Sequence, residues 1–344
     1  MLLPDSLKQF IETRWLDRGH NPYKLLTRCP LCNSSDLRQL FAKWDYDHLE
    51  CQGCDLVFIA QEPLQEFLDD LYENFEYFSA KIRLIEKPRL ERGEDFNFTM
   101  NVDKWYKSIV DQVLRWQQKG IWLDVGGGTG RFLRFIKSYA PKFETRLCES
   151  NTLAGQLAER YCATTTISWE ELESLDGAFQ VISCIAVFEH ISDSVEFMQR
   201  LGRLLTPGGV LYMTMPRLGR LARHVSRSTL YDIAPPMHLR FFSDKSLRYL
   251  ESRLNGTLRL CKLHQTHGKT FQLGHFFRPE WYQFVDVVPE AEGEIPSKIV
   301  MASPSTLWER GIFRLLALID WLVAPLTRAL DGQRVLHAIW QKPV

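Results

Sequence analysis

The sequence has no excess of either charge and no long apolar run. Its 344 residues include 42 basic and 42 acidic side chains, so the formal net charge is zero. That balance argues against a nucleic-acid-binding protein, which usually carries a basic surface. No stretch of about 18 uninterrupted apolar residues is present, so we predict no transmembrane span. The opening segment MLLPDSLKQF lacks the features of a signal peptide, so we expect a cytoplasmic location.

Repeats, low-complexity segments and a G-K-[ST] motif are also missing. The last absence argues against a loop that cradles phosphates. The chain is long enough for two domains or one elaborated domain, and its apolar content of 45% is enough for a full core.

The most informative stretch is IWLDVGGGTG at residues 121–130. Its apolar run, broken only by Asp124, is typical of a buried strand in a parallel sheet. The next segment, RFLRFIKSYA, has apolar residues at helical spacing. We therefore predict a strand, a glycine turn and a helix, in which the bare turn lets a ligand approach the main chain. The glycines of the turn are Gly126, Gly127, Gly128 and Gly130.

Two acidic residues flank this turn. Asp124 ends the first strand, at the edge where open α/β sheets bind ligands. Glu149 follows the next predicted strand, nineteen positions after Gly130, and is placed to accept both hydroxyls of a ribose. Arg131 stands where a dinucleotide fingerprint would have its last glycine. Two acids without a cationic phosphate grip indicate a nucleoside that lacks phosphates; a generic Rossmann-type turn for another nucleotide is the alternative.

Four of the eight cysteines are spaced as a metal site. Cys29, Cys32, Cys51 and Cys54 form two C-x2-C pairs separated by eighteen residues, as in four-thiolate zinc sites. The segment between the pairs predicts a small hairpin, so we expect a structural zinc ribbon. Two disulfides are the alternative, which the lack of an export signal disfavours. His48 is a substitute ligand or, more simply, a surface histidine. The other thiols are interpreted as free core cysteines: Cys148, Cys162, Cys184 and Cys261.

The elements after the ribbon alternate between helix and strand. The polar run KIRLIEKPRLERGED predicts a linker or mobile lid, and a helix with one apolar face follows over 101–119. A buried strand is expected at 178–188, and Asp193 with Glu196 predicts the start of the next helix. This alternation favours a doubly wound α/β sheet.

At this point the chain resembles class I S-adenosylmethionine-dependent methyltransferases. Their first motif reads close to LDVGCGTG, and LDVGGGTG stands at 123–130. FEHI at 188–191, LLTPGGVLYMTMP at 204–216 and PPMHLRFFSDKSLRYLESRLNG at 235–256 are similar to later landmarks of the family. Gln180 replaces a usual aspartate, and Gly127 a common cysteine, without removing a group that the cofactor needs. The resemblance implies that S-adenosylmethionine is bound by Asp124, Gly126, Gly127, Gly128, Gly130, Glu149 and Glu189.

The predicted zinc ribbon before this domain limits the resemblance to a smaller group of methyltransferases. Over roughly residues 27–260, the layout is similar to bacterial methyltransferases with an N-terminal zinc-binding domain. LYENFEYF at 71–78 resembles the aromatic stretch that follows their ribbon. Many of those enzymes act on nucleotide-linked sugars or polysaccharide intermediates, which implies a small, sugar-like acceptor.

Methylation of a hydroxyl or carbon acid requires a general base. Histidine suits that role near neutral pH, and His238 in PPMHLRFF is the first candidate. A hydrogen bond that orients its loop is the alternative. Sugar C-methyltransferases of this type carry a Glu-His pair here, whereas this chain has Met237. His190 is the second candidate, with bracing of the cofactor pocket as its alternative. Surface or core roles are preferred for Tyr77, His224, His264 and His267.

The last third is the least regular part of the sequence. A sixth strand is predicted at 257–263 and a last strand at 335–344, and the connection between them is longer than a loop needs. The aromatic segment 271–281 could line an acceptor pocket. Segment 307–330 is strongly apolar, which favours a helical pair packed on the domain or on a second subunit. An amphipathic surface on the inner membrane, near a lipid-linked glycan, is the alternative.

These expectations define an α/β fold with a doubly wound, Rossmann-like methyltransferase sheet, an N-terminal zinc ribbon and a helical C-terminal insertion. The expected activity is methyl transfer to a sugar, nucleotide-sugar or glycan-pathway intermediate; an RNA methyltransferase and a non-catalytic binding module are alternatives. The expected parts are 1–75 for the ribbon, 76–119 for linker or lid helices, 120–263 plus 335–344 for the catalytic domain, and 264–334 for the insertion.

Overall fold

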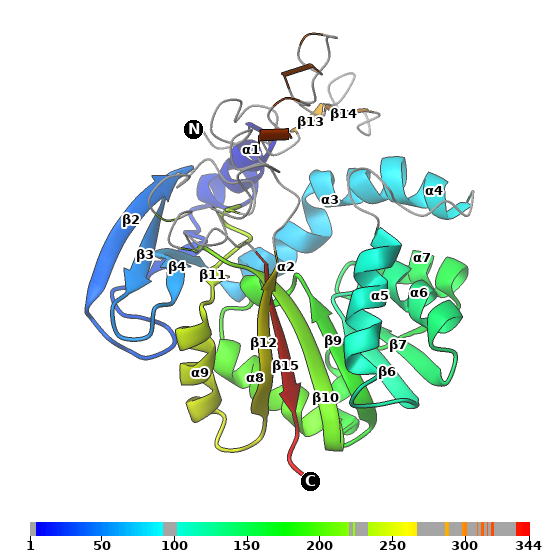
Figure 1. Cartoon of the computed structure of the whole chain (residues 1–344). Coiled ribbons are helices and arrows are strands. Elements are labelled where there is room, and N and C mark those ends of the chain that lie inside the picture. Colours follow the sequence, from blue (N-terminus) through cyan, green and yellow to red (C-terminus); the bar gives the residue numbers. More distant parts are fainter. Residues whose placement is uncertain are drawn as a thin grey trace.

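A seven-stranded mixed sheet forms the centre of the molecule (Figure 1). The computed structural model describes residues 5–91, 102–219, 223, 233–266 and 335–344, together with 286–288, 298–300, 308, 311–312, 315 and 318–319. The strands lie in the order β12-β15-β10-β9-β6-β7-β8, and β15 runs antiparallel to both neighbours. The predicted α/β class is therefore confirmed. The strands are β6 (Gly120–Val125), β7 (Phe143–Cys148), β8 (Thr165–Thr166), β9 (Phe179–Ile185), β10 (Leu205–Pro216), β12 (Arg259–Thr266) and β15 (Val335–Gln341).

Helices cover both faces of this sheet. Trp122 points to one face and packs with α5, α6 and α7, while the next residue, Leu123, points to the other and packs with α8 and α9. This alternation is the two-residue period of a strand that is buried on both sides. The helices are α5 (Val102–Val113), α6 (Arg131–Tyr139), α7 (Thr152–Cys162), α8 (Ser194–Leu204) and α9 (Asp244–Arg253). As predicted, the Asp193 side chain caps α8 by accepting from the amides of Val195 and Glu196.

The cysteine-containing segment builds a second sheet. Its predicted hairpin is present as β2 (Leu37–Lys43) and β3 (Tyr46–Cys51), followed by β4 (Val57–Ile59). The fourth strand is β11 (Arg240–Phe241), which pairs with β4 from a distant part of the chain. The sheet therefore joins the ribbon to the loop that follows the fifth central strand. Around it lie α1 (Asp5–Arg14), η1 (Leu16–Arg18) and the pair β1 (Tyr23–Leu25) and β5 (Gln61–Pro63).

The polar run after the ribbon, for which the sequence predicted a linker or a mobile lid within linker or lid helices at 76–119, is helical up to Glu91. The chain forms α2 (Gln65–Asn74), α3 (Glu76–Lys81), the π-helical turn η2 (Ile82–Glu86) and α4 (Lys87–Glu91). Ile82 and Leu90 are buried against α7, which explains why this segment is ordered despite its charges. The surface position expected for His48 is also wrong, because its ring is fully buried.

The C-terminal strands lie close to their predicted positions. The sixth strand, β12, and the last strand, β15, pair with each other. Most of the insertion 264–334 lies outside the described residues; within it, β13 (Asp286–Val288) pairs with β14 (Lys298–Val300). The aromatic segment 271–281 lies outside them, and so do His224, His267 and most of 307–330. Among the described residues, no helix combines the length and apolarity needed to span a bilayer. The domain limits drawn from the sequence remain predictions.

The remaining short helices are η3 and η4. The first spans Glu171–Ser174, and the second spans Phe188–His190 directly after β9. The position of η4 matters most, because it places two polar side chains at the carboxyl edge of the central sheet.

Candidate functional site

The glycine turn joins β6 to α6 at the carboxyl edge of the sheet. Gly126, Gly128 and Gly130 have positive φ angles of 68°, 57° and 76°, which disfavour other residues. An added Cβ at Gly126, Gly127 or Gly130 would come within 3.0 Å of a neighbouring side chain, so these positions are closely packed. At Gly128 a Cβ would meet nothing within 4 Å. The turn is therefore packed on its inner side and open at Gly128.

The Glu149 carboxylate lies directly against this turn. One of its oxygens accepts a hydrogen bond from the Gly128 amide at 2.7 Å, and the other accepts from the Asn151 amide at 2.9 Å. Burial raises the pKa of Glu149 above its ordinary value, although these amides favour the charged form. The acid that follows β7 and the open glycine are therefore in direct contact, and their assignment to a cofactor site remains a prediction.

Asp124 is buried beneath the turn. Its carboxylate accepts a hydrogen bond from the Ser183 hydroxyl, which in turn accepts from the Trp122 indole at 2.9 Å. Burial raises the pKa of Asp124 to about 7, and the nearby charge of Glu149 adds to the effect. The carboxyl group thus stands close to its titration point at neutral pH.

Two histidines meet at the same sheet edge. His190 comes from η4 and His238 from the loop before β11, and their ring centroids are 4.8 Å apart in an edge-to-face arrangement. The Nδ1 atom of His190 lies 2.7 Å from the Tyr72 hydroxyl and 2.9 Å from the Met237 carbonyl. With hydrogen on Nδ1 the ring donates to that carbonyl, and without it the ring accepts from the tyrosine.

The protonation state of His190 follows from its surroundings. Burial lowers the pKa of His190 well below its ordinary value, and the neighbouring His238 lowers it further. The ring is therefore neutral near pH 7. Glu189 is buried beside it, with a carboxylate oxygen 4.0 Å from Nε2 of His190. Glu189, His190 and His238 form one cluster of ligand-type side chains at this edge.

Two residues near the site were missed by our sequence reasoning. Tyr72 on α2 reaches His190, and its only sequence signal is the aromatic stretch LYENFEYF. Glu86 ends the π-helical turn and accepts a hydrogen bond from the Thr129 hydroxyl at 2.7 Å. Its signal was hidden in the run that we assigned to a linker. Both come from the segment after the ribbon, which therefore contributes to the edge that holds the glycine turn.

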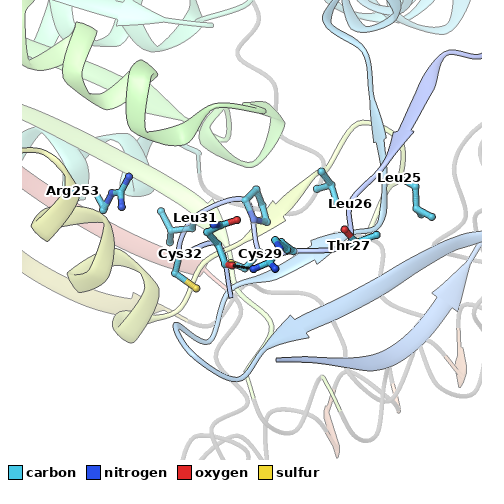
Figure 2. Close-up of a pocket in the computed structure, with 10 residues that line it drawn as sticks. Leu25, Leu26, Thr27, Cys29, Leu31, Cys32 and Arg253 are labelled. Atoms are coloured by element: carbon cyan, nitrogen blue, oxygen red, sulfur yellow. Dashed lines mark hydrogen bonds between the residues drawn. The ribbon is translucent and has the colours of Figure 1, made fainter. Parts of the chain in front are cut away.

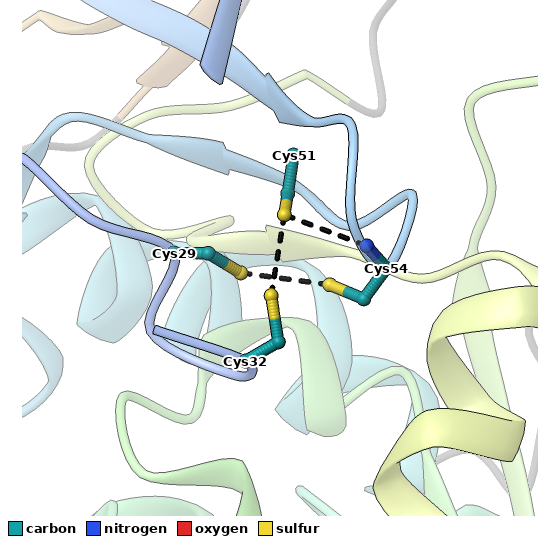
Figure 3. Close-up of side chains that lie close together, drawn as sticks. All are labelled: Cys29, Cys32, Cys51 and Cys54. Atoms are coloured by element: carbon teal, nitrogen blue, oxygen red, sulfur yellow. Dashed lines mark hydrogen bonds between the residues drawn. The ribbon is translucent and has the colours of Figure 1, made fainter. Parts of the chain in front are cut away.

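The four predicted metal ligands converge on one point (Figure 3). The sulfur atoms of Cys29 and Cys54 lie 3.5 Å apart, and those of Cys32 and Cys51 lie 3.3 Å apart. All four lie within 4.8 Å of one another. Four thiolates at about 2.3 Å from a tetrahedral zinc ion would have sulfur–sulfur distances of about 3.8 Å. The geometry therefore fits such an ion.

A shallow pocket of about 370 Å³ lies beside the first cysteine pair rather than at the glycine turn (Figure 2). It is lined by residues 25–33 and by Arg253 of α9. Neither acid of the glycine turn and neither histidine of the edge contributes to it. The candidate site is therefore located by the side chains that converge at the sheet edge, and this cavity is not part of it.

The profile of a methyltransferase domain matches residues 100–255, and no curated protein matches the chain. Among solved structures, the [4+2]-cyclase SpnF is 13% identical with a TM-score of 0.50, covering 82% of this chain and 97% of that one. An S-adenosylmethionine-dependent methyltransferase from Archaeoglobus fulgidus is 14% identical with a TM-score of 0.45, covering 77% and 99%. Phosphoethanolamine N-methyltransferase 2 from Haemonchus contortus is 14% identical with a TM-score of 0.48; the match covers 84% of this chain and 63% of that protein. At these identities the likeness concerns the fold alone.

Gly128→Val is expected to weaken binding of S-adenosylmethionine by about tenfold or more. The new side chain would fill the open space beside Glu149, and a β-branched residue is strained at this positive φ. Isothermal titration calorimetry measures the loss. Gly177→Val is the matched control, because Gly177 also has a positive φ and open space but lies before β9 at the opposite end of that strand. Equal affinities of wild type and Gly128→Val would contradict the assignment of the turn.

The raised pKa of Asp124 predicts a stability that falls with pH. Its folded value is about 7 against an ordinary 3.8, so between these values the folded chain holds a proton that the unfolded chain releases. Its stabilising contribution is full below about pH 4 and is lost as the pH rises through about 7. Urea unfolding without cofactor at about pH 5 and about pH 8 should therefore show a smaller decrease for Asp124→Asn than for wild type. The asparagine stays neutral and still accepts from Ser183, and equal decreases would show that the carboxyl group is ionised throughout.

Proposed function

We propose that this S-adenosylmethionine-dependent methyltransferase methylates a hydroxyl or carbon acid of a small, sugar-like acceptor. Residues 100–255 match the family model of a methyltransferase domain. The observation that carries the proposal is the contact of His190 with His238 at the edge that also holds the glycine turn. A methyltransferase whose acceptor is already nucleophilic needs no base, whereas a hydroxyl or carbon acid does.

The cofactor side of the site fits an uncharged ribose and a sulfonium donor. The open space beside Gly128 supports the approach of a ligand, and we assign to Glu149, which accepts from the Gly128 amide, the binding of the ribose hydroxyls. Asp124 supports the turn from below. S-adenosylmethionine, when bound, supplies an activated methyl group, so the chain has only to position the acceptor, exclude water and move a proton. We assign cofactor binding to Asp124, Gly126, Gly127, Gly128, Gly130, Glu149 and Glu189.

On the acceptor side, the two histidines have different surroundings. His190 is held between Tyr72 and the Met237 carbonyl, and its low pKa keeps it neutral. We assign to it the role of bracing the second ring. His238 is half-buried in the loop before β11, and we assign it the role of general base. It would take the proton from the acceptor hydroxyl or carbon as that atom becomes the nucleophile.

The sugar-like acceptor class rests on two observations. The zinc-ribbon layout resembles bacterial enzymes that act on nucleotide-linked sugars, and the net charge of zero disfavours RNA. The four cysteines are proposed to hold a structural zinc ion, since four sulfur ligands at this spacing fit a closed tetrahedral site. We assign this zinc ion no role in the methyl transfer itself.

A panel of nucleotide sugars tests the acceptor class. Each is incubated with zinc-loaded protein and S-adenosylmethionine, and products are searched by mass spectrometry for the added mass of a methylene group. A methylated nucleotide sugar supports the proposal. Methylation of RNA in a salt-sensitive manner, with no sugar product, would replace it.

His238→Ala is expected to lower kcat by roughly 10²–10⁴-fold on the acceptor that the panel identifies, because the variant lacks the ring to which we assign the proton transfer. Affinity for S-adenosylmethionine should stay near the wild-type value, since the ring lies on the acceptor side. His20→Ala is the control, because His20 is an exposed histidine of the N-terminal region. Unchanged turnover of His238→Ala would remove it as the base.

Cys51→Ser is expected to release zinc and to destabilise the ribbon. Cys51 is fully buried, and its sulfur faces that of Cys32. Metal analysis of the purified protein and thermal unfolding measure both effects. Cys261→Ser is the control, because Cys261 lies on β12 and does not belong to the cysteine cluster. Full retention of zinc by Cys51→Ser would show that the metal is held elsewhere.

A further inference from the structure

Arg240 is an almost fully buried charge at the junction of the two sheets. It lies on β11, two residues after His238, and only 1% of it is exposed. Its guanidinium forms an ion pair with the Glu62 carboxylate, which is equally buried. It also donates to the carbonyls of Leu239 at 3.2 Å and Ser192 at 3.3 Å. The side chain thus joins its own segment, which includes Leu239, to two distant segments, at Glu62 and at Ser192.

The segments of Ser192 and Leu239 are the ones that hold the histidine pair. Ser192 lies two residues after His190, and Leu239 directly follows His238. Glu62 belongs to β5 and is fixed by a second ion pair, with Lys24 of β1, at 2.8 Å. The guanidinium therefore ties the backbone after each histidine to the part of the molecule that surrounds the cysteine cluster.

Main-chain hydrogen bonds complete the same junction. The Leu239 amide donates to the Glu189 carbonyl at 2.7 Å, and its carbonyl accepts from the Ile59 amide on β4 at 3.2 Å. The loop before β11 is thus held on one side by η4 and on the other by the ribbon sheet. Arg240 itself belongs to the ribbon sheet through β11, and its side chain contacts the Ser192 carbonyl next to η4.

A gain in folding stability does not explain why a charged residue is buried at position 240. A buried ion pair gains little over apolar residues of similar volume, because both charges lose their hydration. A guanidinium, however, offers five donors in a fixed plane, so it can hold two carbonyls and a carboxylate at set positions. Two apolar side chains in place of Arg240 and Glu62 could fill the same volume, but they could not hold the two carbonyls in these positions.

We propose that Arg240 is a positioning residue that, with Glu62, fixes the contact between His190 and His238. The inference rests on the function proposed above, in which that pair serves the acceptor. A shift of about 1 Å in a catalytic group can lower turnover by about 10²-fold, so the loss of these ties should be visible in kcat.

The double variant Arg240→Met/Glu62→Met separates positioning from stability. It removes the ties to both carbonyls, yet it leaves no unpaired buried charge. Zinc content, the Kd of S-adenosylmethionine and the thermal midpoint should stay near wild type. Turnover on the acceptor found by the panel should fall about 10–100-fold, mainly in kcat. A double variant that is stable and as active as wild type would overturn the proposal.

A readout independent of the acceptor is the histidine ring signals in ¹H–¹⁵N spectra of zinc-loaded protein. The signals of His190 and His238 should shift in the double variant. Those of His264 and His337, which stack on each other between β12 and β15, should not. Shifted signals with no product from any acceptor would leave the positioning role standing and reject the acceptor class. Unshifted signals reject the positioning role whatever the acceptor.

Arg240→Lys is the second variant, in case the double variant does not fold. Lysine keeps the charge and can pair with Glu62, but its single ammonium lacks the planar fork that reaches both carbonyls. The same shifts of His190 and His238 are expected. Arg14→Met is the control, since Arg14 forms an ion pair with Asp70 between α1 and α2 and touches neither loop. Loss of zinc and cofactor binding in both Arg240 variants would assign Arg240 to folding instead.

Discussion

The carboxyl ends of β6, β7, β9 and β10 meet at one edge of the central sheet, and this constraint brings together the glycine turn, Glu149 and the two histidines of the candidate site. Parallel strands with helical crossovers must bring their following loops to the same edge. The glycine turn after β6, Glu149 after β7 and His190 after β9 therefore come together from distant positions. His238, on the chain that returns after β10, completes the set. No single segment carries the site, because the topology assembles it.

The second constraint is that β11 belongs to the ribbon sheet while its neighbours belong to the catalytic edge. Arg240 and Phe241 pair with β4, and a second buried arginine, Arg223, forms ion pairs with Glu50 and Asp55 beside the cysteines. The ribbon cannot rotate without moving the loop that carries His238. The cysteine cluster, for which we propose a structural zinc ion, can in this way affect chemistry without taking part in it, by fixing the strand to which the loop is attached.

The sequence was most informative where local chemistry has few alternatives. A glycine turn between an apolar strand and an amphipathic helix, and two C-x2-C pairs, each specify geometry within a short segment, and both predicted sets of residues converge in the structure. The pairing of β11 with β4 could not be predicted, because a two-residue strand has no periodicity and its partner lies far away in the chain. The packing of 82–91 on the domain was hidden by its charges, since Ile82 and Leu90 are the residues described as buried there. His48 looked like a surface residue because nothing nearby in sequence shows that Phe41 and Phe241 cover it.

The charges of the site are distributed in a way that suits a cationic methyl donor. Glu149 and Glu86 lie at the glycine turn, with Asp124 close to its titration point beside them, whereas His190, on the proposed acceptor side, is neutral. A sulfonium loses its positive charge when its methyl group leaves, so, in the function proposed above, carboxylates at the turn would attract the donor more strongly than the neutral sulfide product. The same electrostatics that favour binding before transfer thus favour release after it. Because the attraction acts in a partly buried site, where screening by salt is weak, it does not require direct contact between each carboxylate and the sulfur.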